Sequence, residues 1–269
     1  MMRLAVHGAA GRMGRRVVAL AAEDPGFRLV AAIEQPEHSC IGQDAGILAG
    51  CSEVKVPVSS PWPNDIDVVI DFSLPGAVDN VVEHALKAGA SLVMATTGLS
   101  EDHHRKLREA SEQIAIVWAP SMSLAVNLTM KLAQQTTRAL KDIAGGLDIE
   151  ILERHHRFKE DAPSGTALKF GELIADAYRD NDAQPAVQHV HGREGKTGAR
   201  TRNEIGYHAI RTGDNPGEHT IVFGMLGETI ELKVAASNRD CYAAGALAAA
   251  KWLEGKPPGL YSMFDVLDM

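Results

Sequence analysis

The chain has 269 residues, enough for one large domain or two smaller ones. Apolar residues make up 45% and charged residues 23%, proportions typical of a folded globular protein and not of a disordered one. A formal net charge of −8 gives no support to nucleic-acid binding, which favours a basic face. No apolar stretch approaches the length of a membrane span, and no signal peptide is recognised, so we expect a cytoplasmic protein without membrane or nucleic-acid partners.

Apolar strand candidates alternate with helical segments in the first half of the chain. A short apolar run over 3–7 predicts a buried strand, and a helical pattern follows it as far as Pro25. Further strands are expected at 27–34, 65–73, 91–98 and 114–120. Continuously apolar strands separated by helices indicate βαβ units in a parallel sheet that is covered on both faces. This half therefore predicts a doubly wound α/β fold.

The pattern changes after a helix expected at about 123–140. Residues 148–153 alternate polar and apolar side chains, as in a sheet with one solvated face. A helix is expected at about 165–179, and a glycine- and charge-rich stretch follows at 191–217. Residues 220–234 predict a hairpin that turns at Gly227-Glu228. An alanine-rich helix at about 240–254 ends at Gly255. We expect a second domain of the α+β class with a mixed sheet.

A glycine loop follows the first strand and leads into a helix: Gly8-Ala9-Ala10-Gly11-Arg12-Met13-Gly14. Glycines there permit a tight turn and let backbone amides approach a pyrophosphate at the helix N-terminus. The spacing G-x-x-G-x-x-G departs from the usual G-x-G-x-x-G, so the loop alone is a weak signal. Glu34 ends the second strand, where an acidic side chain accepts hydrogen bonds from the adenosine ribose. We predict a nicotinamide dinucleotide site; the alternative is a glycine turn with an unrelated surface glutamate.

The residue after Glu34 bears on cofactor preference. An arginine there would suit a 2′-phosphate, but this chain has Gln35. We expect a preference for NADH, with NADPH usable if Arg12 or Arg15 reaches the phosphate.

A second cluster joins the alternating strand at 148–153 to the following helix. His155, His156 and Lys159 lie within five residues on the connecting loop. An imidazole can exchange a proton near neutral pH, and a lysine can hold an anion or donate a proton. The alternative is a solvated loop with incidental charges. A metal site is not expected, because adjacent histidines seldom converge on one ion and no cysteine or carboxylate set completes the coordination.

The helix after this loop begins with a capping pattern. Ser164 is the expected N-cap, and the amides of Gly165 and Thr166 follow it in the first turn. Such a helix N-terminus is a natural receptor for a carboxylate.

Four segments together resemble the 4-hydroxy-tetrahydrodipicolinate reductase (dihydrodipicolinate reductase) family of lysine and diaminopimelate biosynthesis. They are GAAGRMG at 8–14, ATTG at 95–98, HHRFKEDAPSGTA at 155–167 and GEHTIVF at 217–223. The resemblance extends over essentially the whole chain, and the His-His-x-x-Lys pattern followed by Ser-Gly-Thr is its most specific part. It implies NAD(P)H-dependent reduction of 4-hydroxy-tetrahydrodipicolinate, a dicarboxylate, with loss of water.

The resemblance also implies a domain organisation and an oligomeric state. A Rossmann-like dinucleotide-binding domain would cover residues 1–125, with 240–269 returning to it. A substrate-binding and tetramerisation domain would cover 126–239, and the protein would be a homotetramer.

The resemblance assigns roles to individual residues. Cofactor contacts fall to Gly8, Ala9, Ala10, Gly11, Arg12 and Met13 at the pyrophosphate, to Glu34 at the ribose, and to Ala95, Thr96, Thr97, Ala119, Pro120, Ser121 and Met122 at the nicotinamide. His155 and Lys159 match the catalytic pair, with His155 as proton donor, and His156, Ser164, Gly165 and Thr166 match substrate-binding positions. Two positions depart from the family pattern, because many members have arginine at Gln35 and asparagine at Ser121.

Three other functions stay open. A nicotinamide-sensing regulator would bind the dinucleotide without catalysis, and a specialised relative would reduce a related dicarboxylate. A semialdehyde dehydrogenase would need a nucleophilic cysteine. Cys40, Cys51 and Cys241 have no obvious activating base, and we expect neither a disulfide framework nor a reactive thiol.

Overall fold

The computed structural model describes residues 1–179 and 187–269 and divides into two compact units. Unit 1 comprises Met1–Leu124 and Arg239–Met269, and unit 2 comprises Ala125–Asn238. Within the described residues, none of the helices has the length and apolar character needed to span a membrane.

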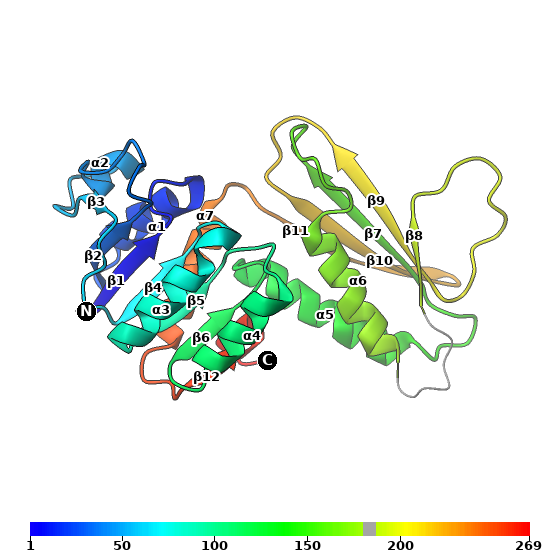
Figure 1. The fold of residues 1–269 in the computed structure, drawn as a ribbon. Helices are drawn as coiled ribbons and strands as arrows, with labels where there is room; N and C mark the ends of the chain where they lie inside the picture. Colours follow the sequence, from blue (N-terminus) through cyan, green and yellow to red (C-terminus); the bar gives the residue numbers. More distant parts are fainter. Residues whose placement is uncertain (180–186) are drawn as a thin grey trace. The chain divides into compact units, whose positions relative to one another are not determined.

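Unit 1 is built on a parallel sheet (Figure 1). Its strands are β1 (Met2–His7), β2 (Phe27–Ile33), β3 (Val58–Ser59), β4 (Val68–Asp71), β5 (Ser91–Met94), β6 (Ala115–Trp118) and β12 (Gly259–Tyr261). They lie in the order β12-β6-β5-β4-β1-β2-β3, and every neighbouring pair is parallel. The order reverses between β1 and β4, which is where ligands bind in doubly wound sheets. The predicted Rossmann-like α/β fold is confirmed.

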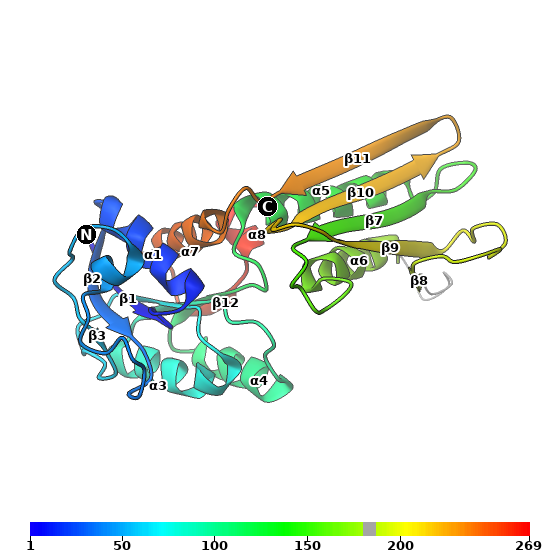
Figure 2. The ribbon, with the colours of Figure 1, turned by 90° about the horizontal axis from the view of Figure 1, so that it is seen from above.

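Helices cover both faces of this sheet. α1 (Arg12–Glu23) and α7 (Asp240–Trp252) lie on one face, and α3 (Val78–Ala88) and α4 (Glu101–Ala110) lie on the other (Figure 2). Alternate residues of β4 enter opposite cores: Val68 and Ile70 pack on the α1 side and Val69 on the α3 side. This is why the strands are continuously apolar. The remaining short elements are α2 (Ala45–Ala49), a 3-10 turn at Pro75–Ala77 and α8 (Met263–Val266).

A close approach brings the alanine-rich helix α7 onto the segment that follows β6. A Cβ on Gly245 would lie 1.8 Å from the carbonyl oxygen of Met122, so no side chain fits there. Ala243 and Ala246, on the same helix, are completely buried. Small residues on α7 are therefore a packing requirement of unit 1.

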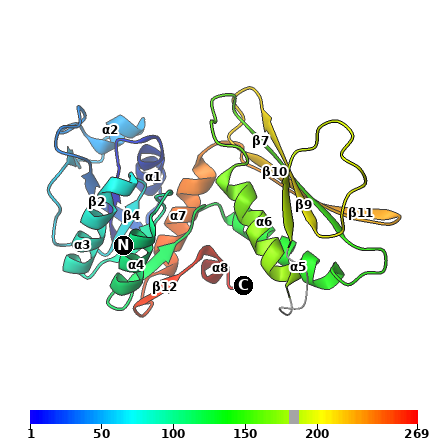
Figure 3. The same ribbon diagram turned by 45° about the vertical axis from the view of Figure 1, so that its right-hand side comes forward.

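In its described residues, unit 2 contains a five-stranded mixed sheet and two helices. The strands are β7 (Asp148–His155), β8 (Gln188–His191), β9 (Glu204–Arg211), β10 (Glu218–Met225) and β11 (Glu228–Ala235), in the order β11-β10-β7-β9-β8. β10 is antiparallel to β7 and β11, whereas β9 is parallel to β7 and β8. Helices α5 (Leu124–Leu140) and α6 (Gly165–Tyr178) lie on the same face of this sheet (Figure 3). The predicted mixed sheet is confirmed.

The register of β7 and β10 explains which residues are buried. Ile151 pairs with Ile221, and one step along the same face Glu153 pairs with His219. All four side chains are buried, although two of them are titratable. The core-facing side of the sheet therefore changes from apolar to polar toward the end of β7.

Two details differ from the sequence-based expectations. The glycine- and charge-rich stretch at 191–217, for which no helix or strand was predicted, contains a full strand, β9. The hairpin turns at Leu226-Gly227 and not at Gly227-Glu228, because Met225 pairs with Glu228 and Gly227 adopts φ +92°. The positive φ explains the glycine, since a two-residue hairpin turn needs left-handed backbone.

Candidate active site

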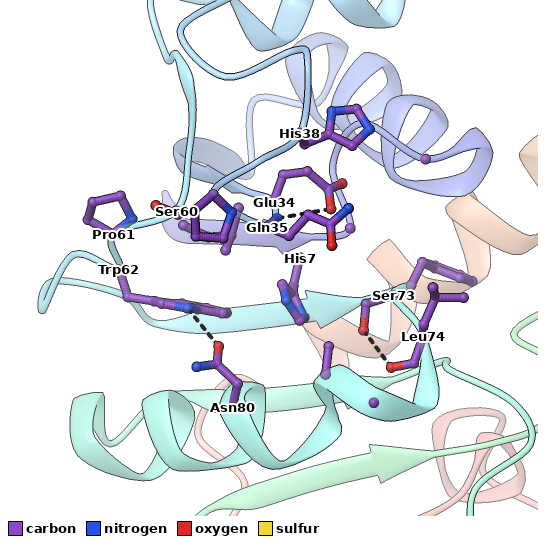
Figure 4. A pocket seen from close by; sticks show the side chains of 17 residues that line it. His7, Glu34, Gln35, His38, Ser60, Pro61, Trp62, Ser73, Leu74 and Asn80 are labelled. Carbon is purple, nitrogen blue, oxygen red and sulfur yellow. Dashed lines mark hydrogen bonds between the residues drawn. The ribbon is translucent and has the colours of Figure 1, made fainter.

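A cavity of about 930 Å³ opens in unit 1 at the carboxyl ends of β1, β2 and β4 (Figure 4). Its wall includes His7, Gly8, Gly11, Ile33, Glu34, Gln35, His38, Trp62, Ser73, Leu74 and Asn80. The position at the switch point of a doubly wound sheet, together with the size, suits a dinucleotide.

The glycine loop is shaped for the close approach of a ligand. Gly8 has φ +73°, and a Cβ there would lie 2.7 Å from the Phe72 carbonyl oxygen. A Cβ on Gly14 would lie 2.1 Å from the Gly8 carbonyl oxygen, so α1 can pack against the loop only without a side chain at this position. The N-cap of α1 is Gly11, which supplies no side-chain cap, and the first-turn amides therefore remain for an anion.

The carboxylate at the end of β2 lies against this loop. Glu34 Oε2 accepts a hydrogen bond from the Ala10 amide at 3.3 Å, and Oε1 accepts one from the Gln35 amide at 3.1 Å. Arg15 is held to the same loop, since its Nε donates to the Ala10 carbonyl at 2.8 Å. Arg12 is exposed. A carboxylate so placed can receive ribose hydroxyl groups.

Hydrogen bonds join three buried residues, His7, which lines the cavity, and Asp71 and Thr96, and of these only Thr96 was among the predicted site residues. His7 Nδ1 lies 2.6 Å from Asp71 Oδ1, and the Thr96 hydroxyl donates to Asp71 Oδ2 at 2.6 Å. His7 ends β1, Asp71 ends β4 and Thr96 follows β5. The two hydrogen bonds of Asp71 therefore connect the carboxyl ends of three neighbouring strands. Their place at carboxyl strand ends is the signal that sequence reasoning could have used.

An aromatic surface forms one side of the cavity. The Trp62 indole donates from Nε1 to Asn80 Oδ1 at 3.2 Å and stacks on His84 with ring centroids 4.9 Å apart. Its other neighbour is His7, at 5.3 Å between centroids. Planar aromatic rings bind well on such a surface.

Only part of the expected cofactor set lines this cavity. Gly8, Gly11 and Glu34 do so. The other predicted residues lie outside the cavity wall, in the glycine loop or in the segments after β5 and β6. They are Ala9, Ala10, Arg12, Met13, Ala95, Thr96, Thr97, Ala119, Pro120, Ser121 and Met122.

The second cluster, in unit 2, is centred on Glu153, which is 1% exposed. His155 Nδ1 lies 2.6 Å from Glu153 Oε2, and the Ser164 amide donates to Oε1 at 3.0 Å. Arg211 donates to the same carboxylate through both terminal nitrogens, each at 2.8 Å. The carboxylate is therefore bonded from three separate segments of the chain.

Burial and charge act in opposite directions on this pair. Burial raises the pKa of Glu153, but hydrogen bonds from Arg211 and His155 outweigh it and hold the pKa below its usual value. Burial also lowers the pKa of His155, and Glu153 opposes that shift only in part. The imidazolium form of His155 is therefore a stronger acid than a free histidine.

The start of α6 lies beside this pair. Ser164 Oγ accepts a hydrogen bond from the Ala167 amide at 3.2 Å and lies 3.1 Å from His219 Nε2. Burial lowers the pKa of His219 to about 4, so this ring is neutral at pH 7. Its Nε2 can therefore accept a hydrogen bond from the Ser164 hydroxyl group. The amides of Gly165 and Thr166 belong to the first turn, where a helix supplies no backbone acceptor.

Two more of the predicted residues lie on the loop between β7 and α6. His156 Nδ1 is buried and has no hydrogen-bond partner within the part of the chain that the structure describes. A buried nitrogen without a partner is costly, and a bound anion would remove that cost. Lys159 Nζ donates to both carboxylate oxygens of Asp161, at 2.7 and 2.9 Å. The cluster thus collects two histidines, an ammonium group and a helix N-terminus.

The structure also locates the cysteines and the other histidine pairs. None of the three cysteines, all of which lie in the described part of the chain, forms a disulfide. Burial raises the pKa of the Cys241 thiol, which disfavours a nucleophilic thiolate there. His103 shares a capping box with Ser100, and His191 lies on β8. Within residues 1–179 and 187–269, no group of three or more potential ligands is placed to hold a metal ion.

Sequence comparisons match both units to one family. A model described as "Dihydrodipicolinate reductase, N-terminus" matches residues 2–122, and one described as "Dihydrodipicolinate reductase, C-terminus" matches residues 125–267. A 4-hydroxy-tetrahydrodipicolinate reductase of Rhodopirellula baltica is 67% identical over 99% of this chain and 96% of its own length. The enzyme of that name from Alkalilimnicola ehrlichii is 46% identical over 99% of both chains.

Solved structures agree at the level of the fold. A dihydrodipicolinate reductase from Paenisporosarcina sp. TG-14, with dipicolinate bound, has a TM-score of 0.76 at 23% identity and covers 98% of both chains. An amine dehydrogenase from Mycobacterium smegmatis has a TM-score of 0.63 at 12% identity, covering 97% of this chain and 95% of its own. Because the family models match nearly the whole chain and full-length relatives exceed 40% identity, the chain belongs to the dihydrodipicolinate reductase family.

Proposed function

We propose that the chain reduces 4-hydroxy-tetrahydrodipicolinate to tetrahydrodipicolinate with a nicotinamide cofactor and loss of water, in lysine and diaminopimelate biosynthesis. The observation that carries the proposal is a histidine–carboxylate pair, His155 and Glu153, bonded to the start of helix α6. Relatives named for this reaction align over nearly the whole chain.

Unit 1 would bind the cofactor, which supplies a hydride to the substrate when it is bound. Amides of the loop at 8–13 would hold the pyrophosphate, and Glu34 the ribose of adenosine. The residues Ala95 to Thr97 and Ala119 to Met122 would face the nicotinamide. Gln35 carries no charge, so a 2′-phosphate would gain no ion pair there, and we expect a preference for NADH.

Unit 2 would bind the dicarboxylate. One carboxylate would accept hydrogen bonds from the amides of Gly165 and Thr166 at the N-terminus of α6. His156 would satisfy its buried Nδ1 through the same ligand. Lys159 would leave Asp161 or share its ammonium group with the substrate, adding the positive charge that a dianion requires.

His155 would deliver the proton. Loss of the 4-hydroxyl group as water leaves a conjugated cyclic imine, hydride arrives at its C4, and a proton must be added elsewhere on the ring. His155 Nδ1 is engaged by Glu153, so Nε2 is the nitrogen that can give its proton to the substrate. Lys159 would stabilise negative charge as it develops.

We further propose that the protein acts in the cytoplasm as a homotetramer that assembles through unit 2. Light scattering coupled to size-exclusion chromatography should give a mass four times that of the 28.8 kDa chain. A monomeric mass at micromolar concentration would contradict this part of the proposal.

The test is an absorbance assay of NADH and NADPH oxidation. Substrate is made in situ from pyruvate and aspartate semialdehyde by the preceding synthase. We expect turnover by the wild type and a kcat lowered roughly 10²–10⁴-fold in His155→Gln, the range for a general acid. His191→Gln, on β8, is the matched control and should keep wild-type kcat. Dinucleotide binding without any turnover by the folded wild type would instead indicate a sensor or an altered substrate.

A further inference from the structure

We propose that Glu153 and Arg211 form a positioning clamp that holds the ring of His155 and determines which of its nitrogens carries the proton in the neutral state. The inference rests on the proposed function, in which His155 donates a proton to the substrate. It assigns roles to two residues that touch neither substrate nor cofactor and act through His155.

The geometry leaves His155 a single arrangement. Nδ1 lies 2.6 Å from Glu153 Oε2, the side chain is 10% exposed, and the ring of His219 meets that of His155 edge-on with centroids 5.2 Å apart. An ionised carboxylate can only accept a hydrogen bond. The neutral imidazole must therefore carry its hydrogen on Nδ1, and Nε2 is left as the nitrogen that gains and loses the catalytic proton.

Arg211 keeps Glu153 ionised and in place. Its two terminal nitrogens each donate to one carboxylate oxygen, the fork geometry that fixes a carboxylate in one orientation. Arg211 ends β9 and is paired in register with His155 on β7, so the sheet itself brings the guanidinium to the carboxylate. The Ser164 amide completes the set on Oε1.

The same guanidinium also holds the loop that carries Lys159. Arg211 Nη2 donates to the Asp161 carbonyl at 2.6 Å, and Nε donates to the Lys159 carbonyl at 3.3 Å. Lys159 in turn is paired with the Asp161 carboxylate. Arg211 therefore links the orientation of His155 to the position of the ammonium group.

Among residues 1–179 and 187–269, the titratable groups that face His155 are Glu153, Arg211, Lys159 and His219, and their effects on its pKa differ. Glu153 on β7 raises the pKa, whereas Arg211 on β9 and Lys159 on the following loop lower it. His219 on β10 is neutral at pH 7, because burial lowers its pKa to about 4. Removing Glu153 should thus move the titration of His155 to lower pH, and removing Arg211 should move it to higher pH.

The variants Glu153→Gln and Arg211→Gln test this prediction. A glutamine amide at 153 can donate to Nδ1, so the neutral ring should change to the form with its hydrogen on Nε2. We expect kcat to fall roughly 10–100-fold in Glu153→Gln with KM changed less than about threefold, the range for a group that orients a reacting histidine. Glu153→Asp, which keeps the charge, should recover part of the kcat. Glu231→Gln, on the exposed strand β11, is the control and should behave as wild type.

Nitrogen-15 NMR of the full-length chain labelled at histidine reads the ring directly. The chain has 11 histidines, and His155→Gln identifies the resonances of His155 by their loss. We expect the Nδ1–H form in the wild type and the Nε2–H form in Glu153→Gln. The alkaline limb of the kcat–pH profile should move to lower pH in Glu153→Gln and to higher pH in Arg211→Gln, because activity falls as a proton donor deprotonates.

Two results would overturn the clamp. One is an unchanged Nδ1–H form in Glu153→Gln; the other is a shift of the pH profile in the same direction for both variants, which a general loss of structure would produce. Failure of the proposed function gives a different result: the ring would respond to Glu153→Gln as expected in the NMR spectrum, but the folded wild type would not turn over the dicarboxylate, or His155→Gln would retain wild-type kcat.

Discussion

At the scale of single residues, the proposed preference for NADH rests on Gln35. It follows Glu34 at the end of β2, lies in the cavity wall and carries no charge. Replacing it with arginine should favour NADPH, because a charge-assisted bond to the 2′-phosphate is worth about 1.5–3 kcal/mol. The kcat/KM ratio of NADPH to NADH should rise about tenfold or more in Gln35→Arg, measured by steady-state kinetics. The exposed Gln113→Arg is the control; a wild type that already prefers NADPH strongly would contradict the reading of Gln35.

The proposed binding role of His156 is linked to a cost in stability. Its buried Nδ1 has no partner among the described residues, and an unsatisfied buried polar atom costs about 1–3 kcal/mol. His156→Phe removes that atom, so the free protein should melt at the same temperature or higher. The KM for the dicarboxylate should rise about tenfold, since the ligand loses a hydrogen-bond partner. A lowered melting temperature with an unchanged KM would show that His156 serves packing instead.

At the scale of single elements, the contact between α1 and the glycine loop leaves no room for a side chain at Gly14. A Cβ on Gly14 would meet backbone atoms of Gly8 and Ala9 at 2.1 and 2.7 Å, and backbone cannot move aside as a flexible side chain can. Gly14→Ala should therefore displace α1, weaken NADH binding at least tenfold and destabilise unit 1 by about 1–3 kcal/mol. Isothermal calorimetry and thermal denaturation measure the two effects. Gly50→Ser is a useful contrast, because its Cβ would meet nothing within 4 Å, although its φ of +80° adds backbone strain.

A network of charged side chains holds the segment after β8 to the strand β7. Glu150 accepts hydrogen bonds from Arg193, Arg200 and His208. Burial raises its pKa, but these bonds outweigh burial and lower the pKa to about 2 from the usual 4.5. A carboxylate whose pKa is lower in the folded state than in the unfolded state stabilises the fold. That stabilisation is fully present above the pKa of the unfolded state and is lost as the pH falls toward the pKa of the folded state.

The variant Glu150→Gln tests that window. At pH 7 it should be less stable than the wild type by about 1–3 kcal/mol, because charged partners lose their acceptor. The difference should shrink as pH falls from about 4.5 to about 2, measured by urea denaturation at each pH. A difference that stays constant across this range would mean that the glutamate acts through packing and not through its charge.

At the scale of the whole molecule, the proposed function places the cofactor on unit 1 and the dicarboxylate on unit 2. If NADH binds in the cavity of unit 1, hydrogen exchange should slow in peptides from Met1–Leu124 and Arg239–Met269. Ligand at about 100 times its Kd should add about 2.7 kcal/mol to the unfolding free energy of the state that binds it. A dicarboxylate such as dipicolinate, added alone, should protect peptides around 153–167 instead. Protection of 153–167 by NADH alone would contradict this assignment.

The amino-acid sequence by itself was enough to predict most strands of the parallel sheet, the glycine loop and the histidine–lysine cluster, because each of these is formed by residues that are neighbours in the chain. Continuously apolar runs between helical patterns predicted the parallel sheet, and the seven residues from Gly8 to Gly14 identified the loop at its switch point. The cluster from His155 to Thr166 was likewise readable, because its residues are neighbours in the chain. Periodicity and spacing record such local geometry directly.

Only the tertiary structure decided the contacts between distant segments. Arg211 reaches Glu153 across 58 residues, and His7 reaches Asp71 across 64. Sheet register makes each of these pairs, and no propensity of the individual residues encodes it. The strand β9 escaped prediction for a related reason: it begins with Glu204 and contains a glycine, and the ion pair of Glu204 with Arg193 forms only when β8 and β9 are side by side. Local pattern thus predicted which groups would carry the chemistry, and the pairing of remote strands decided how those groups are held.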